Sequence, residues 1–142
     1  MDIIKLMHVN DYVIDTAQFR PLLNDKIVKV FEDKVANYVG AKYACSLHSA
    51  TMAIFLCLLG QEKQTIAIPS IIPPVVPSAI LTAGQNIKYK DDVNWVGHSY
   101  VLHDFGNYKI IDSAQQLDKN QFITQANDED LMIFSFYPTK PV

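Results

Sequence analysis

The strongest constraint on the fold of this 142-residue chain is an alternation of short apolar runs with helical segments. Strand-like runs are indicated at residues 43–46, 65–68, 87–90, 100–103, 109–111 and 131–136. Helices are indicated between them, at 25–39, at 52–59 and at 73–83. Strands interleaved with helices are typical of an α/β domain, so we expect a three-layer fold with a mostly parallel sheet and helices on both faces.

The first helix carries the clearest periodic signal. Ile27, Phe31, Val35 and Tyr38 recur at steps of four, four and three, which predicts one apolar face. Residues 24–25 can cap its start, and Gly40 stands where a left-handed residue commonly ends a helix. The later segment at 73–83 has its prolines near its start, where a missing N–H is tolerated, although Pro77 is an awkward residue there.

Composition and charge exclude several classes of function. The balance of 12 basic and 15 acidic residues gives a net charge of −3 without a basic block, so nucleic acid is not an expected partner. The longest apolar run, at 71–76, is far too short to cross a bilayer, so no membrane association is expected. Cys45 and Cys57 lie in apolar surroundings without a CxxC pair, which favours buried, reduced thiols and a cytoplasmic protein.

Several polar residues follow the expected strands directly. In a parallel sheet, functional groups gather at the carboxyl ends of the strands. Thr51, Asp112 and Lys140 lie at or near such positions. A hydroxyl at the start of a helix, as in the turn Ser49 to Thr51, favours phosphate binding, although ordinary helix capping accounts for most such turns. A carboxylate that follows a buried strand, as Asp112 does, needs a partner, and the alternative is a carboxylate that caps the next turn.

Two further motifs are candidates for chemistry. The segment Phe134 to Lys140 places a hydroxyl at Ser135 and an amine five residues later, and such a lysine can form an imine with an aldehyde if its surroundings lower its pKa. A lysine near a chain end is otherwise a solvated surface residue. His103, in the segment 103–106, can pack against a cofactor or transfer a proton, and the alternative is a structural histidine at a strand end. The histidine spacing does not predict a metal site.

In their order and spacing, these motifs resemble the DegT/DnrJ/EryC1/StrS family of pyridoxal-phosphate-dependent sugar aminotransferases. The resemblance runs from Phe31 to Val142. The segment 48–53 is similar to the family's Ser-Gly-Thr-x-Ala phosphate turn, 111–115 to its Asp-x-Ala-Gln segment, and 134–140 to its lysine loop. The last match is the most specific.

The resemblance implies a function and a role for each matching residue. Lys140 would bind the cofactor covalently and act as the catalytic residue that moves a proton between substrate and cofactor. Asp112 would pair with the pyridinium nitrogen and Gln115 would lie near the phenolic oxygen. The phosphate would be bound by Ala50, Thr51 and Ser135. The amine donor would be glutamate or a similar amino acid, the acceptor a nucleotide-linked keto sugar, and the enzyme a homo-oligomer.

The chain departs from the family pattern at three points. Pro73 stands where the family usually stacks an aromatic side chain on the pyridine ring, and Ala50 stands where glycine is usual. The chain also stops two residues after Lys140. We therefore expect residues 1–142 to form part of a cofactor-binding large domain, without the C-terminal small domain and without turnover by itself.

Other readings of the sequence remain open. A non-catalytic binding or interaction module that retains the aminotransferase fold is the main alternative. The dehydratase branch of the family carries histidine in place of the lysine, and Lys140 is evidence against it. A Rossmann nucleotide-binding module is disfavoured because no GxGxxG follows the first strand.

Overall fold

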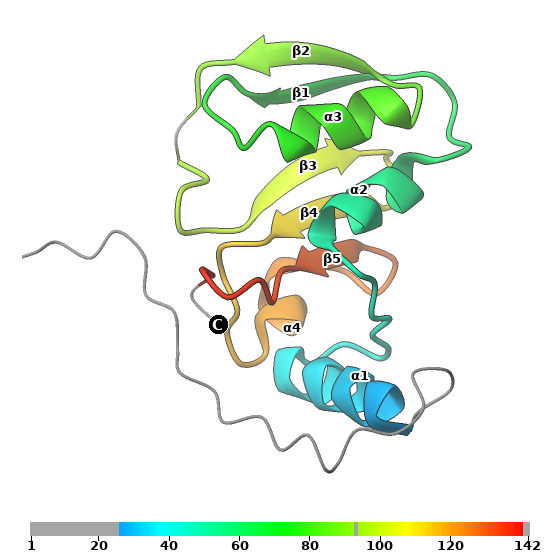
Figure 1. The fold of residues 1–142 in the computed structure, drawn as a ribbon, viewed down its shortest axis with the longest axis vertical. Helices are drawn as coiled ribbons and strands as arrows, with labels where there is room; N and C mark the ends of the chain where they lie inside the picture. Colours follow the sequence, from blue (N-terminus) through cyan, green and yellow to red (C-terminus); the bar gives the residue numbers. More distant parts are fainter. Residues whose placement is uncertain (1–25, 93, 141–142) are drawn as a thin grey trace, which may run out of the picture.

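Helices and strands alternate along the chain in the computed structural model, which describes residues 26–92 and 94–140 (Figure 1). The elements are α1 (Lys26–Val39), α2 (Ala50–Leu58), β1 (Thr65–Pro69), α3 (Val75–Thr82), β2 (Asn86–Lys90), β3 (Tyr100–Asp104), β4 (Lys109–Ser113), α4 (Gln121–Gln125) and β5 (Leu131–Phe134). The expected cap at residues 24–25 lies outside the described residues. No helix in the described ranges is long and apolar enough to span a membrane.

The strands form two hydrogen-bonded sheets, β1–β2 and β3–β4–β5. In space they follow one another in the order β2, β1, β3, β4, β5 (Figure 1). β1 pairs with β2 and β4 pairs with β5 in parallel, whereas β3 pairs with β4 antiparallel. The connection between β3 and β4 explains this exception. It has only the four residues 105–108, and a parallel pair needs a crossover of about a dozen residues or more. The expected α/β class is confirmed, with one reversed strand in the middle.

The hydrophobic core lies between the strands and the helices α2 and α3, which cover the same face (Figure 1). Its buried members are Ile54, Leu58, Ile66, Ile68, Val76, Ala79, Ile80, Leu102, Ile110 and Ile133. Strand β4 is buried on both faces, because Ile110 and Asp112 lie on the α2–α3 side while Ile111 and Ser113 lie on the other. On that other side, the Ser113 hydroxyl contacts Gln121 of α4. Helix α4 is short and lacks an apolar period, and the sequence did not predict it.

The helix α1 forms where predicted, but its buried face is different. Ala36 and Val39 are buried, whereas Ile27, Phe31 and Tyr38 of the expected apolar face are exposed. Gly40 ends the helix with a φ of +79°, as predicted. The periodic signal therefore identified the helix correctly and its inward face incorrectly.

The strand expected at residues 43–46 does not form. This segment has no strand partner in the described structure, and its Cys45 is exposed, so the expectation of a buried thiol there is wrong. The Glu32 carboxylate of α1 instead accepts hydrogen bonds from the backbone N–H and the hydroxyl of Ser46, at 2.8 and 2.9 Å. A short apolar run becomes a strand only when a neighbouring strand satisfies its backbone hydrogen-bonding groups. Here the Glu32 side chain binds the backbone N–H of the last residue of the run, Ser46.

Candidate functional site

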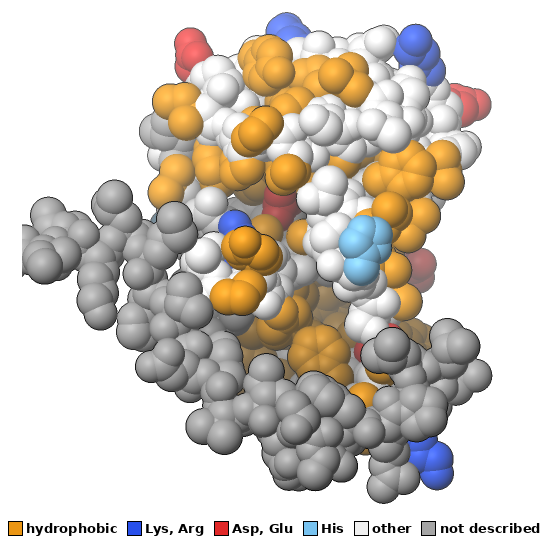
Figure 2. Space-filling model, in the orientation of Figure 1, with side chains coloured by type: hydrophobic (Ala, Val, Ile, Leu, Met, Phe, Trp, Pro, Cys, Tyr) orange, Lys and Arg blue, Asp and Glu red, His pale blue; other side chains and the backbone are white. Residues whose placement is uncertain are grey.

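One recess of about 450 Å³ collects the residues that the sequence singled out. It lies between the start of α2, the segment before α3, the start of β3 and the segments that follow β4 and β5. All seven residues predicted for cofactor binding line it: Ala50, Thr51, Pro73, Asp112, Gln115, Ser135 and Lys140. Figure 2 shows the molecule from the side on which the recess opens, where red and blue side chains meet among orange ones.

Asp112 is the buried carboxyl group of the recess. It is the penultimate residue of β4, its side chain is 6% exposed, and its two carboxylate oxygens have different donors. The Ala114 backbone N–H donates to Oδ1 at 2.9 Å, and the Tyr100 hydroxyl donates to Oδ2 at 3.0 Å. Burial raises the pKa of Asp112, while these two hydrogen bonds and the positive charge of Lys140 oppose the rise.

The start of α2 forms a second part of the recess. Ser49 caps this helix by accepting a hydrogen bond from the Met52 N–H at 3.1 Å, so Ala50 and Thr51 begin its first turn. The first N–H groups of a helix attract anions. Ala50 is tolerated because, among the described residues, Asn120 is the only one besides glycine with positive φ.

Ser135 and Lys140 come from the segment that follows β5. The Ser135 side chain is buried, and Lys140 is half-buried. The Lys140 N–H donates to the Tyr137 carbonyl at 2.8 Å, which closes a turn and brings the lysine back to the recess. Three segments distant in sequence thus place an amine, a carboxylate and a helix N-terminus around one space.

Gln115 and Pro73 line other parts of the same recess. The Gln115 side-chain carbonyl accepts a hydrogen bond from the Gly97 N–H at 2.9 Å, which holds the loop before β3 against the loop after β4. Pro73 lies just before α3, and its carbonyl accepts a hydrogen bond from Val76. Pro73 therefore contributes a rigid apolar surface.

The residues of the recess that the sequence reasoning missed include Trp95, His98 and Tyr100. Trp95 is 8% exposed and packs edge-on against Tyr100, with ring centroids 6.2 Å apart. Their common feature is that they precede or begin β3. Because β3 runs opposite to the other strands, its first residue lies beside the carboxyl end of β4, and Tyr100 pairs directly with Asp112. The short connection after β3 was the only signal of this.

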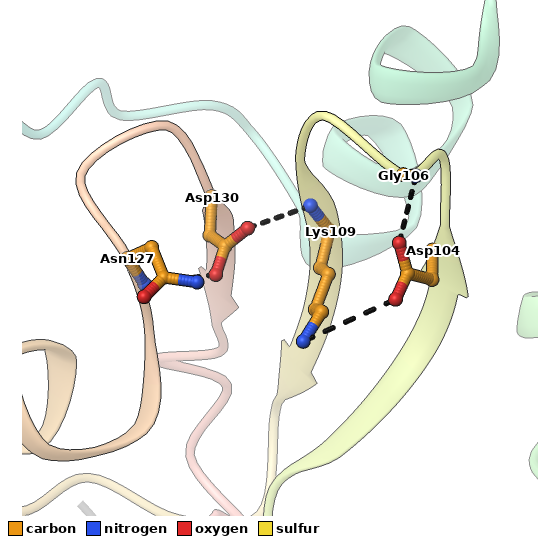
Figure 3. Close-up of polar contacts among 5 residues, drawn as sticks. All are labelled: Asp104, Gly106, Lys109, Asn127 and Asp130. Carbon is orange, nitrogen blue, oxygen red and sulfur yellow. Dashed lines mark hydrogen bonds and ion pairs between the residues drawn. The ribbon is translucent and has the colours of Figure 1, made fainter.

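The motif that contains His103 lies at the other end of the strands, away from the recess. His103 packs edge-on against Phe105, and it does not line the recess. Burial lowers the pKa of His103, and Asp104 opposes the shift. Figure 3 shows Asp104 accepting a hydrogen bond from the Gly106 N–H and lying 3.9 Å from the Lys109 amine. The motif therefore lies away from the recess, and the described residues contain no cluster suited to a metal ion.

Comparison with known proteins found a matching family model and related transaminases. The family model of the DegT/DnrJ/EryC1/StrS aminotransferase family matches residues 7–74. Two relatives from Campylobacter jejuni subsp. jejuni, of serotypes O:2 and O:23/36, are both UDP-4-amino-4,6-dideoxy-N-acetyl-beta-L-altrosamine transaminases. Each is 27% identical over 158 aligned positions, which cover 85% of this chain and 42% of the relative. The chain thus spans about two fifths of their length.

No solved structure gives a significant match. The family match begins before the described residues and reaches the recess through the start of α2 and Pro73. The lysine loop, residues 134–140, lies beyond the range that the family model matches. The family match and the two transaminases both support the DegT/DnrJ/EryC1/StrS aminotransferase family as the one that this chain resembles.

Proposed function

We propose that this chain is the cofactor-binding portion of a pyridoxal-phosphate-dependent enzyme that moves an amino group from a glutamate-type donor to a nucleotide-linked keto sugar. The observation that carries the proposal is the meeting of Lys140, Asp112 and the start of α2 around one recess. The names of the two relatives support a sugar substrate. The proposed large domain is a three-layer one, which further chain would complete together with a small domain.

The residues of the recess fit this cofactor in size and in chemistry. A volume of about 450 Å³ lies within the usual range for small-molecule sites. The cofactor has three recognisable ends: an anionic phosphate, a ring nitrogen that becomes cationic, and an aldehyde. The recess offers a helix N-terminus with hydroxyls at Thr51 and Ser135, a buried carboxylate at Asp112, and an amine at Lys140.

When bound, pyridoxal phosphate supplies an electron sink for the carbon that exchanges its amino group. The residues of the chain hold and complement it. Thr51, Ser135 and the first N–H groups of α2 would bind the phosphate, and Ala50 would let the backbone approach it. Asp112 would keep a proton on the ring nitrogen. Lys140 would bind through its amine and afterwards carry the proton between donor and acceptor carbons.

Gln115 and Pro73 would complete the surroundings of the ring. Gln115 would lie near the phenolic oxygen, where its position is already set by the Gly97 N–H. Pro73 would cover one ring face with an apolar surface that has no π system. This departure from the family pattern favours a second candidate, a binding module that retains the fold without catalysis. Lys140 and Asp112 in one recess favour the enzyme.

Covalent binding of the cofactor tests the proposal without requiring turnover. The purified chain is mixed with pyridoxal phosphate, its visible absorption is recorded, and borohydride is added before peptide mapping. We expect a visible band and a reduced adduct on Lys140, and we expect Lys140→Ala to lose both. The matched control is Lys109→Ala, which removes a lysine at the start of β4, at the other end of the strand from the recess (Figure 3).

The outcomes separate the candidates. A band that persists in Lys140→Ala, or an adduct spread over several lysines, contradicts the proposed role of Lys140. Absence of any band from the folded chain leaves the non-catalytic module as the better reading. Sedimentation of the same samples shows whether the chain forms the homo-oligomer that the proposal includes.

A further inference from the structure

The reversed strand β3 places a phenol against the buried carboxylate of the recess. Tyr100 and Asp112 are direct cross-strand partners, and the Tyr100 hydroxyl donates to Asp112 Oδ2 at 3.0 Å. Oδ1 accepts the Ala114 N–H. A carboxylate oxygen can accept more than one hydrogen bond, so these contacts leave capacity for a cation in the recess. No function assigned above uses Tyr100.

We propose that Tyr100 is a positioning residue of the candidate site: its hydroxyl orients the Asp112 carboxylate and stabilises its ionised form, so that Asp112 can pair with a ring cation. This inference rests on the proposed function for the role of Asp112. It depends on the strand pairing and on the hydrogen bond, and both belong to the ligand-free chain.

The electrostatic surroundings explain why the hydroxyl matters. Burial is the largest influence on Asp112 and favours its neutral form, which cannot hold a proton on a ring nitrogen. The Ala114 N–H, the Tyr100 hydroxyl and the Lys140 charge counter it, in that order. His98 of the loop before β3 and Tyr137 of the segment after β5 also line the recess. Among the three countering groups, the Tyr100 hydroxyl is the one that a substitution removes without changing charge or backbone.

The surroundings of Tyr100 hold its ring in place. Trp95 packs edge-on against the ring. On the other face of the sheet, Ser99, which precedes Tyr100, and Ser113, which follows Asp112, are also hydrogen-bonded, with their hydroxyls 2.8 Å apart. Gln121 of α4 donates to both of these hydroxyls, at 2.8 and 3.2 Å. The two strand segments that carry Tyr100 and Asp112 are thus fixed from both sides, which gives the hydrogen bond a set direction.

The test compares Tyr100→Phe with the wild-type chain, both without cofactor. Carboxyl carbons of aspartate are labelled, the Asp112 signal is assigned by its loss in Asp112→Asn, and its titration is followed by NMR. We expect the pKa of Asp112 to rise in Tyr100→Phe, because the ionised form loses a donor. The matched control is Tyr108→Phe, which alters a ring stacked on Phe105 and should leave the Asp112 titration unchanged.

A second readout links the pair to the cofactor. Hydrogen bonds to charged groups contribute more than neutral ones, so we expect Tyr100→Phe to bind pyridoxal phosphate about tenfold more weakly, with Tyr108→Phe unaffected. If no variant binds the cofactor, the proposed function fails, and the cofactor-free titration still decides the role of Tyr100. An Asp112 pKa that is the same in Tyr100→Phe and wild type overturns the inference.

A reciprocal measurement covers the case in which Tyr100→Phe does not fold. Burial and the Asp112 carboxylate both raise the pKa of the Tyr100 hydroxyl. In Asp112→Asn the charge is gone while the shape is kept, so the pKa of Tyr100 should fall. A Tyr100 titration that ignores the loss of this charge would equally overturn the inference.

Discussion

Two carboxylates, Glu32 and Asp112, have pKa values shifted in opposite directions by their surroundings. The N–H of Ser46, followed by its hydroxyl, lowers the pKa of Glu32 below its ordinary 4.5. Burial raises the pKa of Asp112 above its ordinary 3.8, despite its hydrogen bonds. Glu32 is a structural residue at the surface, whereas Asp112 faces a recess. A shift that disfavours the charged form is typical of a residue kept for chemistry.

This contrast predicts opposite effects of pH on two neutral variants. The ionised Glu32 side chain adds stability that is present above pH 4.5 and is lost as the pH falls through its lowered pKa. The difference in free energy of unfolding between wild type and Glu32→Gln should therefore shrink over that pH range. For Asp112, stability is lost as the pH rises from 3.8 through its raised pKa, so Asp112→Asn should gain on wild type over that interval. Urea unfolding at a series of pH values measures both. Parallel curves for the two variants would contradict this assignment of signs.

The sequence was sufficient to predict the main polar residues of the recess. It was insufficient to predict the aromatic residues that line the recess from the β3 side. Asp112, Ser135 and Lys140 each follow an apolar run, which is the position where chemistry gathers in an α/β sheet. Trp95 precedes β3 and Tyr100 begins it, and no local pattern marks these positions as functional. Their placement depends on the direction of β3, which is a property of strand pairing and not of these residues.

Helices and strands were predictable where a local signal and the tertiary environment agree. The helix α2 starts where the capping residue Ser49 predicts. The run at residues 43–46 has suitable apolar residues, but a strand needs a partner that local sequence cannot supply. The inward face of α1 was mispredicted for a similar reason, because the local period does not show which neighbours bury Ala36 and Val39.

One buried side chain links the starts of the two parallel strands β4 and β5. Asp130 accepts the Lys109 N–H at 2.7 Å and the Asn127 N–H at 2.8 Å (Figure 3). Its side chain is 7% exposed. Replacement by alanine leaves two backbone donors without their acceptor, and each such group is costly to bury.

We therefore expect Asp130→Ala to lower the free energy of unfolding by about 1–3 kcal/mol. The neighbouring Glu129 is exposed, and Glu129→Ala should change the free energy by less than about 0.5 kcal/mol. Chemical denaturation of both variants checks this. A loss of similar size in both would mean that the acceptor role of Asp130 is unimportant.

The two outermost strands of the molecule, β2 and β5, differ in how they resist pairing with other chains. Among the described residues, β2 pairs only with β1 and β5 pairs only with β4. The edge strand β2 carries Lys88 and Lys90, whereas β5 consists of four apolar residues. Charged side chains on an edge strand oppose association, and apolar edges favour it. The β5 edge is thus the place where self-association is expected.

Leu131→Lys tests this expectation by adding a charge to the β5 edge, at a residue whose side chain is 42% exposed. We expect the variant to shift toward monomer in sedimentation velocity at a protein concentration where wild type associates. Ile123→Lys is the matched control, since it adds the same charge to an exposed apolar position on α4. If both variants dissociate equally, general surface hydrophobicity and not the strand edge drives association.

The four-residue connection between β3 and β4 has a consequence for how relatives of this chain can change. Insertions in surface turns have a small energetic cost, because the entropy of closing a loop grows slowly with its length. An insertion long enough for a crossover would let β3 run parallel to β4, and the opposite end of the strand would then border Asp112. Tyr100 would then lie at the far end of β3, and Asp112 would lose the hydroxyl that pairs with it now. In this fold, a change in loop length at one end of the strands can change the functional groups at the other end, although every residue of β3 stays the same.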